Sequence, residues 1–352
     1  MEFGIQFFPA VGPDQKPADQ YWREALELTQ LAEGLGFTNV RTVEHYFLPY
    51  GGYSPDPLIF LSAAAALTRS MRLITGAVLP VFNNPLKLAG QIGMVDAISA
   101  GRLEVGFARA FLPHEFARFG ISMDESRARF EEGLEQVRRL LEEEKVTARG
   151  RFHTFENATS LPRPTQKPRP PFWIAALSTR ETFETAGALG HYLMGIPLGG
   201  AHMAGLLKSY RDAWTAAGHP GRGKVMLAFH MFCAETTAQA AAIARAPLNQ
   251  YLKSIVDAAS GFLTGMSSRD YPNYQKMIEG LARETFESQV EKGLAWIGTP
   301  EEIRGAIDAY HRGIGGFESA SLQVNFGMIG QAKAEASMRL FAREVMPYFA
   351  RV

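Results

Sequence analysis

The sequence predicts a single (β/α)8 barrel, also called a TIM barrel, a fold of the α/β class, and two observations carry this prediction. Short runs of β-branched and aromatic residues recur eight times, and stretches with helical periodicity separate them. The chain of 352 residues has the length of one such barrel with insertions. A doubly wound parallel sheet is the alternative, but its usual strand count is lower. We therefore expect one domain that spans residues 1–352.

The first half of the chain holds four of the expected strand–helix units. Apolar and β-branched residues dominate the strands, which are expected at 2–8, 37–44, 72–80 and 101–108. Apolar residues recur every three to four positions in the helices, which are expected at 19–36, 56–70, 85–99 and 123–144. Gly36 is placed to end the first of these helices, and Asp124 is placed to cap the start of the fourth.

The second half repeats the same alternation four more times. Its strands are expected at 171–177, 191–197, 224–235 and 319–326. Helical periodicity is clearest at 178–190, 203–218, 299–316 and 332–349.

Two segments exceed a minimal barrel. Residues 145–171 follow the fourth unit, are rich in proline and arginine, and lack helical periodicity. Residues 260–293 lie in the region between the seventh and eighth strands and contain many turn-forming residues. Long insertions beside a barrel mouth often serve as binding loops or lids. We expect residues 145–171 to be an insertion outside the barrel and residues 260–293 to be a mobile lid.

Composition excludes several functional classes. Lysine plus arginine and aspartate plus glutamate both number 36, so the formal net charge is zero and no nucleic-acid or anionic membrane partner is indicated. Cys233 is the only cysteine, which excludes an internal disulfide and fits a reducing compartment. We find neither a signal-like N-terminus nor an apolar run of the roughly 20 residues that a membrane span needs. A cytoplasmic location is expected.

The second expected strand ends on a carboxylate and an imidazole, Glu44 and His45. In a (β/α)8 barrel the catalytic groups collect at the carboxyl ends of the strands. Histidine is the side chain that most readily exchanges a proton near neutral pH. We therefore expect His45 to be catalytic and Glu44 to hold its position. The alternative is that His45 only packs the following loop against the strand.

A second group of residues suits a phosphate monoester. Ser178, Thr179 and Thr182 open a helix directly after the fifth strand, where hydroxyls and unpaired N–H groups attract anions. Arg109 directly follows an apolar strand, and Arg127 lies in the first turn of a helix, where its charge opposes the helix dipole. The alternative for the hydroxyls is an ordinary helix cap. The chain has no glycine-rich dinucleotide or ATP motif and no metal-ligand spacing among its eight histidines.

These residues lie in segments that resemble a known family. The stretches "EGLGFTNVRTVEHYF" and "DAISAGRLEVGFARA" carry the resemblance most specifically, and "MEFGIQF", "PPFWIAALSTRETFETAGALG", "WIGTPEEI" and "MRLFAREVMPYF" extend it almost from end to end. The sequence resembles the bacterial luciferase-like, flavin-dependent monooxygenases, and specifically the luciferase alpha-subunit type. The resemblance implies a barrel that is usually dimeric and that uses reduced FMN from a separate flavin reductase. In that chemistry O2 adds at flavin C4a, and the C4a-hydroperoxyflavin then transfers one oxygen atom to a small organic substrate.

The resemblance also assigns roles to residues of this chain. It implies that Arg109, Arg127 and the hydroxyls after the fifth strand bind the FMN phosphate, and that the Gly76–Ala77 bond is a cis peptide beneath the flavin ring. His45 matches the catalytic histidine of the alpha chain. The complete expected cofactor set is Gly76, Ala77, Ala108, Arg109, Arg127, Leu177, Ser178, Thr179 and Thr182. The expected walls of the substrate pocket are Phe7, Phe47, Tyr53, Phe82 and Phe111.

Two departures from the alpha chain concern the reaction. Ala108 replaces a reactive cysteine beside the flavin, and Tyr46 replaces a second histidine. These changes argue against light emission from a fatty aldehyde and leave flavin-dependent oxygenation as the expectation. Two alternatives remain: hydride transfer with the deazaflavin F420, and a non-catalytic flavin-binding paralogue. The segment "EHYF" favours an oxygenase over the first, and His45 with the long 260–293 segment argues against the second.

Overall fold

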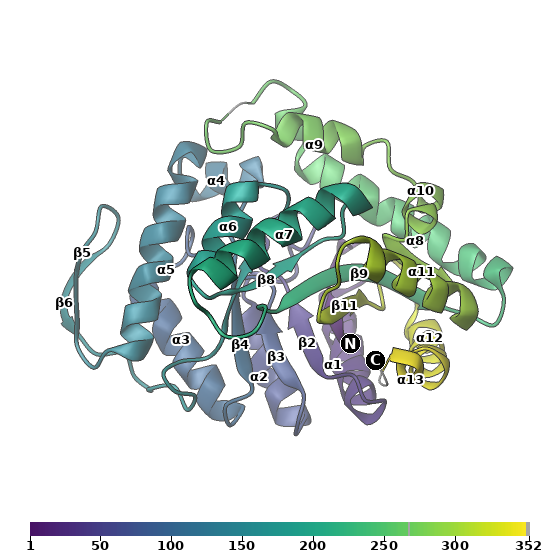
Figure 1. Ribbon diagram of the computed structural model, residues 1–352, viewed down its shortest axis with the longest axis horizontal. Helices are drawn as coiled ribbons and strands as arrows, with labels where there is room; N and C mark the ends of the chain where they lie inside the picture. The colour runs from purple at the N-terminus through teal and green to yellow at the C-terminus, as the bar shows by residue number, and fades with distance from the viewer. Residues whose placement is uncertain (267, 350–352) are drawn as a thin grey trace.

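The computed structural model describes residues 1–266 and 268–349. Parallel strands close into a barrel in the order β11-β1-β2-β3-β4-β7-β8-β9, and β9 pairs with β11 to complete the ring (Figure 1). The barrel strands are β1 (Glu2–Phe7), β2 (Asn39–Thr42), β3 (Arg72–Thr75), β4 (Leu103–Phe107), β7 (Phe172–Ala175), β8 (Tyr192–Gly195), β9 (Val225–Cys233) and β11 (Ser319–Gln323). All eight fall within the ranges expected from sequence, and the predicted (β/α)8 barrel is confirmed.

Helices follow the strands and cover the outside of the barrel (Figure 1). In the first half they are α1 (Ala18–Gly34), α2 (Pro57–Leu67), α3 (Pro85–Ile98), α4 (Pro113–Phe119) and α5 (Ser126–Glu142), which the 3₁₀ turn η1 (Met123–Glu125) precedes. In the second half they are α6 (Arg180–Ala188), α7 (Gly200–Ala216), α8 (Thr237–Ala258), η2 (Ser260–Phe262), α9 (Tyr274–Leu281), α10 (Phe286–Glu291), α11 (Pro300–Gly313), α12 (Gln331–Glu344) and α13 (Met346–Phe349). None of the described helices combines the length and hydropathy that a membrane crossing requires.

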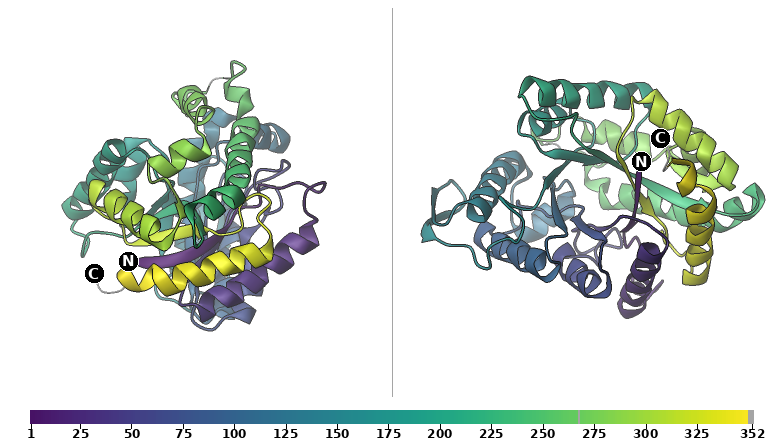
Figure 2. Two further views of the ribbon diagram at one scale, coloured as in Figure 1. Left: turned by 90° about the vertical axis from the view of Figure 1, so that its right-hand side faces the viewer. Right: turned by 60° about the horizontal axis from the view of Figure 1, so that its bottom comes forward.

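The alternation of side chains along each strand separates the core from the barrel interior. In β1, Phe3 packs against Phe341 of α12, and Phe7 packs against Phe60 of α2, so these residues face the helices. Gln6 lies between such positions and faces into the barrel, where it contacts Arg41 of β2. The apolar core therefore lies between the strands and the helices, while some interior positions are polar. Figure 2 shows α12 beside α1, and the Met1 amino group donates to the Phe349 carbonyl of α13 at 3.4 Å.

One strand of the main sheet was not expected. β10 (Ala295–Gly298) pairs with the second half of β9, outside the ring of eight. It is a fully buried apolar run of four residues. A run this short shows no periodicity that separates a strand from a loop or a helical turn.

The segment 145–171 is an excursion outside the barrel. It contains an antiparallel hairpin of β5 (Val146–Arg149) and β6 (Thr154–Ala158), and it packs along α5. Backbone N–H groups of Arg151, Phe152 and His153 donate to the Glu132 carboxylate of α5 and hold the hairpin turn in place. Of this segment, only Arg169 contributes to the cavity described below.

The segment 260–293 contains η2, α9 and α10, and residue 267 lies outside the described residues. Asp124 does not cap α5, which was the expectation. Its carboxylate accepts hydrogen bonds from the Ser268 hydroxyl and the Arg269 N–H, at 2.5 and 3.0 Å. The Asp270 carboxylate instead accepts from the Arg127 N–H at the start of α5, at 3.0 Å. Asp270 of the 260–293 segment thus satisfies an N–H group at the start of α5, where Asp124 was expected as the local cap.

Candidate active site at the barrel mouth

A cavity of about 1070 Å³ opens at the carboxyl ends of the barrel strands. This volume is at the upper end of the range for small-molecule and cofactor sites. Twelve of the residues predicted from sequence line it: Glu44, His45, Gly76, Ala77, Ala108, Arg109, Phe111, Arg127, Leu177, Ser178, Thr179 and Thr182. The loops after β2, β3, β4 and β7 therefore bring the sequence-predicted groups together in one place.

His45 is held by a carboxylate, but not by Glu44. Its Nδ1 lies 3.1 Å from Oε1 of Glu115, a fully buried residue of α4. The same oxygen accepts the backbone N–H of Tyr46 at 2.9 Å. A carboxylate bound to Nδ1 favours the tautomer that carries its proton there, which leaves Nε2 as the second functional nitrogen. The contact with His45 that was predicted for Glu44 is made by Glu115.

Glu44 belongs to a separate network. Its carboxylate accepts hydrogen bonds from the Tyr46 hydroxyl at 2.5 Å, the Leu79 N–H at 3.0 Å and the Asn83 side chain at 2.9 Å. These donors favour the ionised form, but burial outweighs them and raises the pKa of Glu44 to about 8. Glu44 is therefore mostly protonated at neutral pH and adds little negative charge to the cavity.

The conformation of the loop after His45 accounts for the glycine at position 51. Gly51 has a φ of 78°, and a Cβ at this position would lie 2.7 Å from the Cβ of His45. Glycine is thus required both for the backbone conformation and for the close approach to the imidazole. The His45 N–H donates to the Ser54 carbonyl at 3.1 Å, which ties the two ends of the loop together. His45 thus lies in a turn that a backbone hydrogen bond closes.

Arg109 is a half-buried cation with incomplete hydrogen bonding. Its Nη2 donates to the Asp270 carbonyl at 3.2 Å, and its guanidinium lies 4.7 Å from the centre of the Tyr271 ring. Its Nη1 is buried and has no hydrogen-bond partner among the described residues. A buried donor without a partner is costly, so this N–H is suited to bind an anion that enters the cavity.

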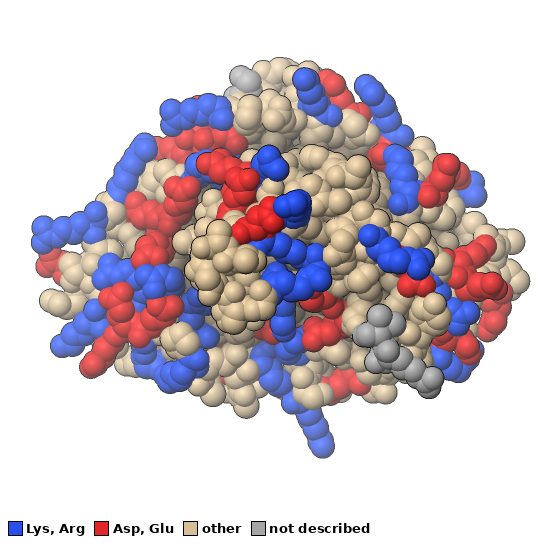
Figure 3. All heavy atoms as spheres, in the orientation of Figure 1, with Lys and Arg blue, Asp and Glu red and all other residues tan. Residues whose placement is uncertain are grey.

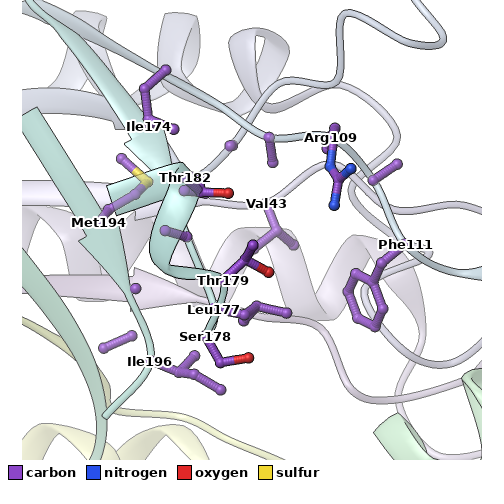
Figure 4. A pocket seen from close by; sticks show the side chains of 18 of the residues that line it. Val43, Arg109, Phe111, Ile174, Leu177, Ser178, Thr179, Thr182, Met194 and Ile196 are labelled. Atoms are coloured by element: carbon purple, nitrogen blue, oxygen red, sulfur yellow. The ribbon is translucent and has the colours of Figure 1, made fainter. Parts of the chain in front are cut away.

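The start of α6 faces the same space. Figure 4 shows the side chains of Ser178, Thr179 and Thr182 on one side of the pocket and Arg109 on the other. Thr179 is the N-cap residue of α6, and within the described chain its side chain makes no capping hydrogen bond. The ordinary cap that was the alternative is therefore absent. Arg127 pairs with Glu181 at 3.3 Å, and both side chains are more than a third exposed, so this ion pair is weak.

Small and apolar residues also line the cavity. The Gly76–Ala77 bond is cis, as the resemblance implied, and both residues line the cavity with Ala108 and Leu177. A Cβ on Gly76 would lie 2.2 Å from the Arg41 side chain. This part of the lining is therefore apolar and made of residues with small or uncharged side chains.

Phe7, a predicted wall residue, does not reach the cavity. It is fully buried between the barrel and α2, where its ring lies 5.6 Å from that of Phe60. Strand alternation is the reason, because the preceding residue Gln6 faces inward and lines the cavity in its place.

Three further wall predictions are also corrected. Phe82 stacks on Phe119 of α4, with ring centres 4.7 Å apart, and Phe47 packs on the same ring while its side chain stays half exposed. The Tyr53 hydroxyl donates to the Lys16 carbonyl at 3.0 Å, away from the cavity. These aromatics pack the loops of the mouth against one another. Of the five predicted wall residues, Phe111 alone lines the cavity.

Two features of the site were not foreseen. Glu115 comes from a helix 70 residues after His45, and no local pattern links the two. The second feature is a row of polar side chains on the cavity floor: Gln6, Arg41, His230 and Gln323. A signal for this row exists in the sequence, because each residue interrupts an apolar strand at an interior position.

The 260–293 segment contributes to the mouth from above. Tyr274 of α9 lines the cavity, and the Tyr271 hydroxyl donates to the Ala110 carbonyl at 2.7 Å.

Over the described residues, no group of three His, Cys, Asp or Glu side chains is placed to hold a metal ion. On the face in Figure 3, acidic and basic side chains are interspersed, in keeping with the zero formal net charge.

Comparisons with known proteins agree with this picture. The flavin-dependent trigonelline monooxygenase, oxygenase component, of Acinetobacter baylyi is 28% identical over 348 residues, which are 96% of this chain and 92% of that protein. Limonene 1,2-monooxygenase of Rhodococcus erythropolis is 27% identical over 331 residues, with 92% and 80% covered. The crystal structure of the monooxygenase RslO1 from Streptomyces bottropensis matches with a TM-score of 0.88 and 43% identity, over 99% of this chain and 100% of that one.

More distant structures share the fold alone. The oxygenating constituent of 3,6-diketocamphane monooxygenase from Pseudomonas putida, solved in complex with FMN, gives a TM-score of 0.82 at 21% identity, with 99% and 98% covered. An F420-dependent secondary alcohol dehydrogenase gives 0.75 at 15% identity, with 98% of each chain covered. Residues 1–315 match the family model described as luciferase-like monooxygenase, which confirms the resemblance seen in the sequence. The chain belongs to the luciferase-like monooxygenase family.

Proposed function

We propose that this chain is the oxygenating component of a two-component monooxygenase that uses reduced FMN and O2 to oxygenate a small organic substrate. One observation carries the proposal: the orphaned Nη1 of Arg109 faces the uncapped start of α6 across one end of a large cavity. The names of two relatives support it, since one is the flavin-dependent oxygenase component of its system and another was solved with FMN. A separate reductase would supply the reduced flavin.

The residues at this end of the cavity fit the FMN phosphate. A phosphate monoester carries about −1.5 to −2 charges and three acceptor oxygens. Arg109 offers an unsatisfied charged donor, and Ser178, Thr179 and Thr182 offer hydroxyls beside the positive end of a helix dipole. Arg127 is held only by an exposed ion pair, so it can turn toward a phosphate at little cost.

The middle of the cavity suits a flat aromatic ring system. Gly76, Ala77, Ala108 and Leu177 present little side-chain bulk and no charge, so they can hold a ring and exclude water from it. Reduced flavin supplies the electrons and the carbon that reacts with O2 when it is bound there. The protein supplies binding, orientation and a dry environment.

His45 is the group placed to move a proton. Glu115 binds its Nδ1 and so fixes the ring and its tautomer, which leaves Nε2 to accept or donate a proton in the cavity. We assign proton exchange with the reacting oxygen or the substrate to this nitrogen. The alternative is that His45 and Glu115 only hold the loop against α4, since Glu115 also accepts the Tyr46 N–H.

The phosphate assignment is tested by comparing two flavins. Arg109→Ala should weaken FMN binding by about 1.5–3 kcal/mol, the range for a hydrogen bond to a charged group. It should leave riboflavin binding nearly unchanged, because riboflavin has no phosphate. Arg118→Ala is the matched control, since Arg118 lies over the Phe47 ring outside the cavity. Equal losses for both flavins would show that Arg109 does not bind the phosphate.

The fold itself does not choose between flavins, because an F420-dependent dehydrogenase shares it. Reduced FMN and reduced F420 are therefore titrated into the protein in parallel in the absence of O2. The proposal expects tight binding of reduced FMN only. A dimer belongs to the same proposal, and light scattering of the purified protein tests it.

A further inference from the structure

The floor of the cavity is an unusual layer for a (β/α)8 barrel. Interior layers of such barrels are usually filled by Val, Ile and Leu from alternate strands. Here Arg41, Gln6, Gln323 and His230 are successive partners across the adjacent strands β2, β1, β11 and β9. Because partners in register point to the same face of a sheet, the four side chains form one row. All four line the cavity, and each is at most 8% exposed.

Arg41 carries a charge that the described part of the chain does not neutralise. Its Nη2 donates to Oε1 of Gln6, and its Nη1 lies 3.6 Å from the Met194 sulfur. Among the described residues, its Nε has no hydrogen-bond partner, and the guanidinium forms no ion pair with an acidic side chain. Burial lowers the pKa of Arg41 to about 10, so the guanidinium is still charged at neutral pH. Glu44, one of the acidic residues that line the cavity, is mostly protonated at neutral pH.

The neighbours of Arg41 are also incompletely satisfied. Nε2 of His230 and Oε1 of Gln323 are buried without a partner among the described residues. Burial lowers the pKa of His230 to about 3, so its ring is neutral and one of its nitrogens can act as a hydrogen-bond donor. Buried polar atoms in folded proteins are nearly always paired, so a cluster of unpaired ones along a single row implies a partner that enters the cavity.

Two residues further along the same strands, the lining becomes apolar. Phe8 follows Gln6 at this spacing, and Val43 follows Arg41. The cavity thus has a cationic floor, apolar walls above it, and the candidate catalytic histidine at the mouth. A ligand that fits this arrangement carries an acidic oxygen at one end of an apolar body.

We propose that Arg41, with Gln6, Gln323 and His230, binds a negatively charged oxygen of the organic substrate, such as a carboxylate, phenolate or enolate. This inference rests on the proposed function, because it concerns the substrate of the same site. The charged oxygen would anchor the substrate at the floor and leave its apolar part directed toward His45. Gly76 keeps room for the Arg41 stem, since a Cβ there would overlap it.

The test uses two probes of equal shape, 2-naphthoate and 2-naphthamide, titrated by calorimetry into the full-length protein. The wild type should bind the anion at least tenfold more tightly than the amide, as expected for a charge-assisted hydrogen bond. Arg41→Met and Arg41→Gln should each reduce this preference to twofold or less. Lack of preference in the wild type, or its survival in the folded variants, would overturn the inference.

Thermal stability separates a binding role from a structural one. Arg41→Met removes an unpaired buried charge, so its melting temperature should equal or exceed that of the wild type. Arg102→Met is the matched control, because Arg102 donates to the carbonyls of Ala65 and Met71 and to the Thr68 hydroxyl. It should melt at a lower temperature and keep the preference for naphthoate. If neither Arg41 variant folds, Arg41 is structural and the inference is wrong.

Two further titrations identify which part of the cavity binds naphthoate and which binds FMN. Arg109→Ala should weaken FMN binding and keep the naphthoate preference, whereas loss of the preference would place naphthoate at the phosphate end. FMN titration of Arg41→Met should give wild-type affinity. Weaker FMN binding with an intact naphthoate preference would assign Arg41 to the flavin and overturn the substrate assignment. Failure of the wild type to bind FMN would contradict the proposed function. The naphthoate titrations would still show whether Arg41 binds an anion.

Discussion

Glu44→Gln is the substitution with the most sharply defined effect on stability. Burial raises the pKa of Glu44 from 4.5 to about 8 in the folded protein. The folded state therefore keeps this proton over a pH range in which the unfolded chain has lost it. The stabilisation is fully present below about pH 4.5 and is lost as pH rises through about 8. One pKa unit corresponds to about 1.36 kcal/mol, so the loss between these limits is roughly 5 kcal/mol.

Glutamine has no proton to release, so Glu44→Gln should remove this pH dependence. It should also cost a constant amount, about 1–3 kcal/mol, because its amide places a donor where Leu79 N–H or Asn83 already donates. The free energy of unfolding is measured by urea denaturation from pH 5 to pH 8.5 for both proteins. The free energy of unfolding of the wild type minus that of Glu44→Gln should fall steadily, by several kcal/mol, as the pH rises.

Glu33→Gln is the control for this experiment. Hydrogen bonds from residues 69–71 lower the pKa of Glu33 despite some burial, so its contribution is lost at low pH rather than at high pH. The free energy of unfolding of the wild type minus that of Glu33→Gln should therefore not fall between pH 5 and pH 8.5. Parallel stability curves for wild type and Glu44→Gln across this range would refute the assignment of a protonated Glu44.

Three other predictions concern the site and the segment above it. His45→Ala should bind FMN normally but release hydrogen peroxide in place of product. The yield of product per flavin oxidised should fall by about 10²–10⁴-fold, the range that general acid–base groups contribute. A wild-type product yield in a folded variant would show that His45 only packs the loop. Glu115→Gln should show the same defect in weaker form, and imidazole nitrogen shifts measured by NMR should show a changed tautomer ratio. Trypsin should first cut the native protein near Arg269, and FMN or phosphate should slow the cut; a first cut elsewhere would contradict a lid at residues 260–293.

The barrel could be predicted because its signals are local and repeated. Each of the eight strands is an apolar run beside a helical pattern, and each lies within its expected range. β10 and the β5–β6 hairpin were missed because their runs are short and lack a decisive period. The cap of α5 was wrong for a different reason. Asp270, which satisfies the helix end, comes from a segment more than 140 residues away.

The site was predictable where a single rule located it. The carboxyl ends of barrel strands gave His45, Arg109 and Thr179, and all three line the cavity. The partner of His45 was not predictable, since Glu115 reaches it through the fold rather than along the chain. Four wall residues were chosen for their aromatic character, and strand alternation or loop packing placed them elsewhere. Attention to polar residues inside apolar strands would have found the floor.

The central claim is that this protein holds reduced FMN while O2 reacts and delays the return of oxidised flavin. Rapid mixing of the protein–reduced FMN complex with O2 tests it directly, with oxygen uptake and the visible absorbance of oxidised flavin followed together. We predict that oxygen uptake is complete before the oxidised-flavin absorbance returns, and that free reduced FMN shows no such interval. Simultaneous uptake and absorbance return in the presence of saturating protein would contradict a monooxygenase function.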